Sequence, residues 1–214
     1  MRYDDIDKIK KNASNVLDEI EKDDFMHIFL KSFKYSLKRK NIFISILLTM
    51  LILVVALIRI GYSEDTVSKF LLLVESSNTI ALVMFGAVIM GYTIFQALAQ
   101  GATLKEFLLN NDSDKSQFHS YNLSFFNTTI VYLLIIVINY ILIIILKTIP
   151  PDWHIIYFDN SINNFIATIL IFIYTLFNIY AFLEIKSFIF NLYKCFSINA
   201  VANTIEFIKE ESDE

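Results

Sequence analysis

The chain has 214 residues, of which 56% are hydrophobic and 15% aromatic, and its mean hydropathy is +0.55. These values lie outside the usual range of soluble globular domains. A formal net charge of -4 shows no basic footprint for nucleic acid, and the single cysteine excludes an intramolecular disulfide. We therefore predict an all-α polytopic membrane protein that needs no cofactor and binds no nucleic acid.

Residues 1–40 are predicted to form amphipathic cytoplasmic helices. The first apolar run begins only at Ile42, behind a long charged segment that does not resemble a cleaved signal peptide. Five apolar residues recur at alternating spacings of three and four, which is the a/d seam of a helix that packs on a partner helix. They are Ile6, Ile9, Ala13, Val16 and Ile20. Asp23 and Asp24 then predict a stop and the start of a second helix.

Basic residues concentrate directly before the first apolar run. They are Lys31, Lys34, Lys38, Arg39 and Lys40. We expect these side chains to contact the inner leaflet, where each contributes about 1 kcal/mol next to anionic lipid, although they could equally just follow the positive-inside rule. Ten of the 18 basic residues precede the first span. We therefore predict a protein of the plasma membrane whose N-terminus lies in the cytoplasm.

Four long apolar segments predict a transmembrane domain over residues 41–183, folded as a four-helix bundle. The spans are expected at residues 42–60, 79–99, 125–146 and 162–183. About 20 apolar residues at roughly 1.5 Å each cross a hydrocarbon core of about 30 Å. With both termini inside, 15 of the 18 basic residues fall on the cytoplasmic side.

The predicted loops differ in character. Residues 61–77 and 148–161 are expected outside, and residues 100–121 inside. In the second outer loop Pro150 ends a helix, and Trp153 marks the level of the lipid headgroups. His154 in this loop is interpreted as a lone interfacial histidine, because the other two histidines fall on the opposite side of the membrane. No metal site is predicted.

Residues 184–214 are predicted to form a cytoplasmic helix with an acidic tail. The apolar pattern continues beyond the fourth span, and a break is expected near residues 197–199. The acidic residues at the end are usually solvated. They could instead pair with the basic N-terminal helix, although exposed ion pairs contribute little.

Each span carries one polar or small face, and the clearest lies on the second span. At 100° per residue one stripe contains Thr79, Gly86, Thr93, Ala97 and Gln100. Asn139 and Asn178 lie on the polar faces of the third and fourth spans. In lipid, helices associate through small residues and hydrogen bonds between polar side chains, so we expect these positions to face protein. The alternative is that the stripe lines a water path between several subunits.

Ionisable side chains are predicted at the ends of spans, not in their interior. They are Arg59, Glu75, Lys147 and Glu184. This disfavours a proton relay, a pump or a voltage sensor. The sequence also shows no nucleophile arrangement, phosphate-binding loop or metalloprotease motif, so we expect no enzymatic activity.

Two functions remain open from the sequence. The first is a membrane protein that acts by binding a cytosolic protein or other copies of itself, as in a bacterial defence or toxin-immunity system. The second is an oligomeric pore or membrane-disrupting effector gated by its cytoplasmic helices. An excess of Ile, Asn, Lys and Phe indicates an AT-rich, bacterial source. The step from there to defence is an association and not a physical argument.

Overall fold

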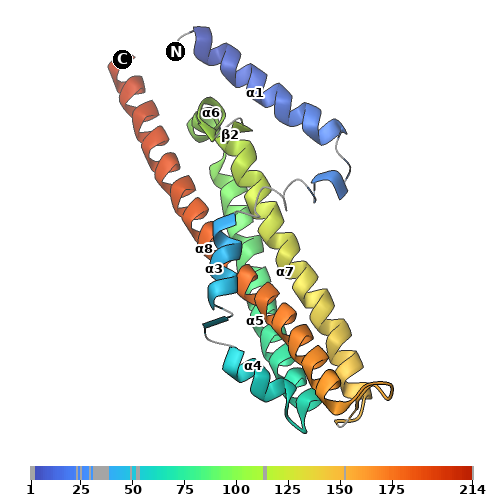
Figure 1. The fold of residues 1–214 in the computed structure, drawn as a ribbon. Coiled ribbons are helices and arrows are strands. Elements are labelled where there is room, and N and C mark those ends of the chain that lie inside the picture. Colours follow the sequence, from blue (N-terminus) through green and yellow to red (C-terminus); the bar gives the residue numbers. More distant parts are fainter. Residues whose placement is uncertain are drawn as a thin grey trace. The chain divides into compact units, whose positions relative to one another are not determined.

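The chain is almost entirely helical (Figure 1). The computed structural model describes residues 3–22, 24, 26–28, 30, 39–48, 50–51, 54–112, 115–151 and 153–213. Among these residues, the strands are two short segments, β1 (Asn111–Asp112) and β2 (Lys115–Ser116), which pair as an antiparallel hairpin. The predicted helical class is confirmed.

Three helices are long and apolar enough to cross a membrane. They are α5 (Thr66–Leu98), α7 (Gln117–Thr148) and α8 (Asn160–Asp213), with 33, 32 and 54 residues. At about 1.5 Å per residue even the shortest extends for roughly 48 Å, more than a hydrocarbon core of about 30 Å. These helices support the prediction of a membrane protein with several transmembrane helices.

The predicted first span, residues 42–60, is not confirmed. In the described residues this run contains α3 (Arg39–Leu48), α4 (Val54–Gly61) and the helical residues 50–51 between them, while residues 49, 52 and 53 lie outside the described residues. Neither α3 nor α4 by itself is among the candidate spans. Three candidate spans, and not four, are therefore found in the described part of the chain.

Two predicted boundaries are wrong. α5 begins at Thr66, so most of the outer loop expected at residues 61–77 is helical. α8 runs without interruption through the break expected at residues 197–199. The polar side chains there are satisfied within the helical structure, because the Ser197 hydroxyl donates to the carbonyl of Tyr193 at 3.1 Å and the Asn199 amide donates to the Thr103 hydroxyl at 2.9 Å.

The chain divides into two compact units, and the three long helices contribute to both. Unit 1 contains Met1–Ser36, Ala87–Thr129 and Lys186–Glu214, and unit 2 contains Leu37–Gly86 and Ile130–Ile185. Along α5, one face is buried at a spacing of seven residues. It consists of Val74, Ala81, Val88 and Phe95. Seven residues are close to two helical turns, so these side chains lie on one side of the helix.

Unit 1 is built around aromatic side chains. The ring of Phe95 contacts those of five others at centroid distances of 4.9–6.4 Å: Tyr92, Phe107, Phe118, Tyr121 and Phe125. Phe107 belongs to α6 (Gly101–Leu109), a short helix that the sequence did not predict. Gly101 starts this helix with a φ of 52°, a left-handed conformation that glycine adopts without a steric cost. The chain can therefore turn sharply between α5 and α6.

Helix α1 (Tyr3–Lys22) packs on α6 (Figure 1). The Asn12 amide donates to the carbonyl of Leu108 at 2.6 Å. Ile9, Ala13 and Val16 of the predicted seam are partly buried, whereas Ile6 is exposed. Part of the seam expected to bind a partner helix is thus covered within the chain.

Unit 2 contains α3, α4 and the parts of the three long helices within residues 66–86, 130–148 and 160–185. A Cβ at Gly61 would lie 3.1 Å from Cα of Thr168, so α4 and α8 approach closely at this glycine. Phe70 of α5 meets Tyr174 of α8 edge to face at 5.3 Å. The core of this unit includes Val74, Ile135 and Ile171.

Candidate functional site

A polar cluster joins the three long helices inside unit 2. The hydroxyl of Tyr174 donates to the side-chain oxygen of Asn139 at 2.8 Å, and the Asn139 amide reaches the hydroxyl of Ser77 at 3.5 Å. Ser77 in turn donates to the side-chain oxygen of Asn178. Asn139 and Asn178 are both buried. The two asparagines therefore face protein and share one network with a serine and a tyrosine.

The sequence did not identify the whole cluster. Ser77 lies in the segment expected to be an outer loop, and tyrosine is common at membrane interfaces, so neither residue was predicted to bond with the asparagines. The helical spacing offers a signal in retrospect. Tyr174 and Asn178 are four residues apart on α8, and the Asn178 amide donates to the Tyr174 carbonyl at 2.9 Å.

A cavity of about 660 Å³ lies next to this cluster in unit 2. Its walls come from the start of α5, the end of α7, the start of α8 and the loop between the last two helices. Phe70 and Ile171 contribute apolar surface, while Glu64, Trp153 and Asn164 contribute polar groups. Asn163 is occupied in holding the loop, because its amide donates to the carbonyl of Ile155 at 3.1 Å and its oxygen accepts the amide N–H of the same residue at 3.1 Å.

Three charged side chains of unit 2, Lys147, Glu75 and Glu184, are paired or buried. Lys147 and Glu75 form an ion pair of 2.9 Å. Glu184, which the sequence places at the end of the fourth span, is buried, since only 2% of its surface is exposed. One turn earlier on α8, the Ala181 carbonyl accepts a hydrogen bond of 2.9 Å from the Tyr132 hydroxyl. Glu184 also has interactions of its own and is not a free carboxylate.

The predicted stripe on α5 does not pack against the chain's own helices. All five of its residues are exposed: Thr79, Gly86, Thr93, Ala97 and Gln100. A Cβ added at Gly86 would meet nothing within 4 Å. The expectation that Gly86 and Ala97 bring α5 close to neighbours within the chain is therefore wrong, and the buried glycine is Gly91, which contacts Phe188. The reason is that α5 turns a different face inward. That face carries Ala81, Val88 and Phe95, each two residues after a member of the stripe.

The remaining predicted contacts lie mostly outside the described residues. Lys31, Lys34 and Lys38 are not described, and of Arg39 and Lys40 only the helical backbone is. The predicted acidic tail makes one described ion pair, from Glu206 to Lys105 of α6 at 3.7 Å. Within the described ranges, His, Cys, Asp and Glu side chains form no group of three or more that could hold a metal ion.

Comparisons of the chain with models of protein families, with curated proteins and with solved structures find no match. The residues themselves are what points to a function. Inside unit 2 the polar groups bond to one another, and on α5 a row of small and polar residues faces outward. Such an arrangement can hold helices together and can receive a further helix.

Proposed function

We propose that the chain is a non-enzymatic multi-pass protein of the plasma membrane that acts by binding other polypeptides. In this proposal residues 42–60 cross the membrane as a fourth span, so that both termini and the α5–α7 connection are cytoplasmic, an orientation that places most basic residues inside. The partner is a cytosolic protein or further copies of the chain, and a toxin that the chain blocks or localises would be one such partner.

The outward stripe of α5 is the observation that carries this proposal. Thr79, Gly86, Thr93 and Gln100 follow one another at a spacing of seven, on a helix that is apolar enough to cross a membrane. Lipid tails gain nothing from contact with small and polar side chains. A second helix does, because small side chains let the two backbones approach closely. Position 86 offers the closest approach, since glycine has no side chain to hold the neighbour away.

The hydroxyl groups of the stripe favour packing over a water path. Thr79 donates to the Glu75 carbonyl at 3.0 Å, and Thr93 donates to the Ile89 carbonyl at 3.0 Å. Each threonine thereby satisfies its donor within α5 and presents mainly its methyl group to the outside. Rings of carbonyl or charged groups, which select ions in pores, are not what this row offers.

Cysteine accessibility separates this proposal from a pore. Single cysteines at Thr79, Gly86, Thr93 and Gln100, in a Cys195→Ser background, are treated with a water-borne thiol reagent in intact membranes. We expect reaction at Thr79 and Gln100 and protection at Gly86 and Thr93. Reaction along the whole row, together with depolarisation of cells that express the chain, would support the oligomeric pore instead. Ala87→Cys, which is exposed at the same depth but about 100° around α5 from Gly86, is the matched control for lipid protection.

A further inference from the structure

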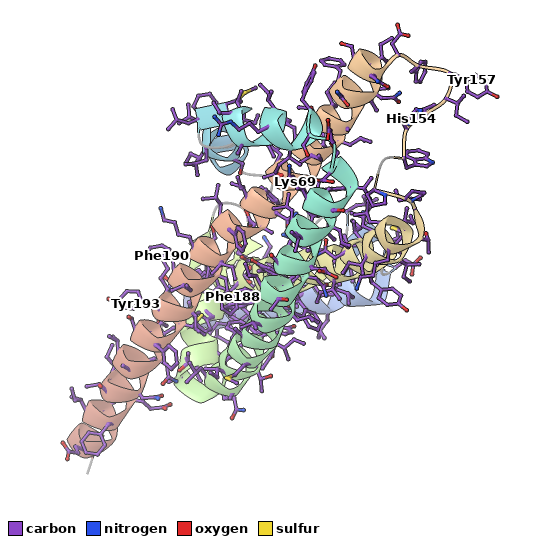
Figure 2. All side chains as sticks on the ribbon, turned by 90° about the horizontal axis from the view of Figure 1, so that it is seen from below. Lys69, His154, Tyr157, Phe188, Phe190 and Tyr193 are labelled. Carbon is purple, nitrogen blue, oxygen red and sulfur yellow. The ribbon has the colours of Figure 1, made fainter. Side chains whose placement is uncertain are left out.

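The part of α8 that the proposed function places in the cytoplasm exposes apolar side chains that the described residues of unit 1 leave uncovered. Ile189, Tyr193, Phe196 and Phe207 are 59%, 66%, 48% and 59% exposed. Their neighbours on the other side of the same helix, Phe188, Cys195 and Ala202, are buried. Figure 2 shows this contrast directly, because Phe188 points toward α5 while Phe190 and Tyr193 project from the opposite side of α8.

The exposed residues follow the spacing of a coiled coil. Along residues 189–207, positions separated alternately by four and three form one seam. The seam consists of Ile189, Tyr193, Phe196, Ala200, Asn203 and Phe207, and all six are exposed. A row of this spacing turns the same side chains toward a partner helix over nearly three heptads.

Lipid is a poor candidate to cover this seam. α8 is unbroken from Asn160 to Asp213, so the segment continues the helix of the fourth predicted span and does not lie flat on the membrane. Residues 189–207 begin about 9 Å beyond residue 183, the inner end of that span, at roughly 1.5 Å per residue. The segment also contains Asn203 and Ser197, which suit a protein contact exposed to water at its rim.

We propose that residues 189–207 of α8 pack in parallel against the same residues of a second copy of this chain. Copies of a membrane protein insert with the same orientation, so their α8 helices run parallel and present the seam at the same level. The helix is already formed as part of unit 1, which removes the entropic cost of ordering a short isolated coiled coil.

The exposed area is consistent with a weak dimer. Aromatic side chains bury about 150–250 Å² each, so the four large side chains of the seam, which are roughly half exposed, remove on the order of 400 Å² per copy, or about 800 Å² for the pair. That is the size of a weak or transient interface. Confinement to one membrane raises the effective concentration of the copies and favours a contact of this size.

Charges do not oppose the parallel arrangement. Lys194 lies 4.7 Å from the ring centroid of Phe190 of the same chain, and Glu206 pairs with Lys105 at 3.7 Å. Both charged side chains in residues 189–207 are therefore engaged within their own copy. A parallel pair brings no unpaired like charges together along the seam.

Disulfide formation tests the proposal in native membranes of cells that express the full chain with Cys195→Ser. Phe196→Cys and Ala200→Cys, on the seam, are expected to form a crosslinked dimer under mild oxidation. Ile205→Cys is the matched control, since it is exposed on α8 but lies about 140° away from Ala200. Equal crosslinking at Ala200 and Ile205, no crosslinking at either seam position, or adducts with a different protein would overturn the proposal.

A charge exchange then excludes a merely structural effect. Ala200→Glu, combined with Phe196→Cys, places two like charges face to face and should abolish the dimer, as should Ala200→Lys in the same combination. Coexpression of the Glu and Lys chains should restore the crosslinked dimer. Ile205→Glu should leave it unchanged. Dimers that persist in both single charged variants, or that the mixture does not restore, would contradict parallel pairing of the two α8 helices. These results are independent of the accessibility of the α5 stripe.

Discussion

Asn139 shows how much a single polar residue in a span can reveal. An amide in hydrocarbon must find partners, and this requirement alone predicts that Asn139 and Asn178 face protein. The identity of the partners depends on tertiary structure, because Ser77 and Tyr174 belong to different helices. Glu184 shows the opposite case. Its position beside the last apolar run predicts the end of a span and says nothing of its burial, which results from the continued packing of α8.

Replacement of Asn139 by leucine tests the polar cluster. The change removes the hydrogen bonds to Ser77 and Tyr174 and leaves both hydroxyls with fewer partners. At about 0.6 kcal/mol for an average hydrogen bond in a membrane, the free energy of unfolding should fall by roughly 1 kcal/mol. Steric trapping in bilayers or thermal unfolding in detergent measures the difference. Tyr140→Leu, at the next and exposed position, should change stability little. Equal stability of the Asn139 variant and the wild type would contradict the network.

At the scale of elements, α5 explains why the sequence predicts a helix well but not its orientation. Two rows repeat every seven residues along it, one apolar with Val88 and Phe95 and one small and polar with Gly86 and Thr93. Both rows satisfy the helical period, and the rule that polar residues face protein in a membrane selects the second. The aromatic core around Phe95 selects the first. Long-range contacts decide the rotation of the helix, and a single sequence does not record them.

The two glycines of α5 test this orientation. Gly91→Ala should destabilise the chain by about 1–3 kcal/mol, the usual cost of an overpacked core, because its Cβ would overlap the ring of Phe188. That ring cannot easily move, since it is buried and packs edge to face on Phe125 at 5.3 Å. Gly86→Ala should not destabilise the isolated chain, as its Cβ meets nothing. Unfolding in detergent compares the two variants, and a larger loss for Gly86→Ala would show that the opposite face of α5 is the buried one.

For the whole molecule, apolar runs longer than 20 residues predict a polytopic helical protein, and three of the four expected spans appear as long helices. The first run is shorter, and the structure describes it only in part, chiefly as α3 and α4. Sequence also misses α6, because a nine-residue helix between two long ones has little periodicity of its own. The position of the chain in the membrane depends on the distribution of charge and not on the fold.

Cysteine labelling tests the proposed orientation. In the Cys195→Ser background, an impermeant maleimide added from outside should label Tyr157→Cys, because this residue is 93% exposed in the loop between α7 and α8. Asn110→Cys, exposed at the end of α6, should be labelled only after the cells are opened. Figure 2 shows Tyr157 at the tip of its loop, accessible to such a reagent. The reverse pattern of labelling would place the α5–α7 connection outside and the loop between α7 and α8 inside.

The loop that carries Tyr157 also carries Trp153, the only tryptophan of the chain, which lies in the wall of the cavity in unit 2. All indole fluorescence of the protein therefore originates at this single place. Its emission wavelength reports whether the mouth of the cavity is in water or in lipid, without an engineered label. Quenching by iodide or by brominated acyl chains distinguishes the aqueous from the lipidic neighbourhood of that side chain. A molecule that enters the cavity would change the emission of Trp153, so binding can be followed by fluorescence in the unmodified protein.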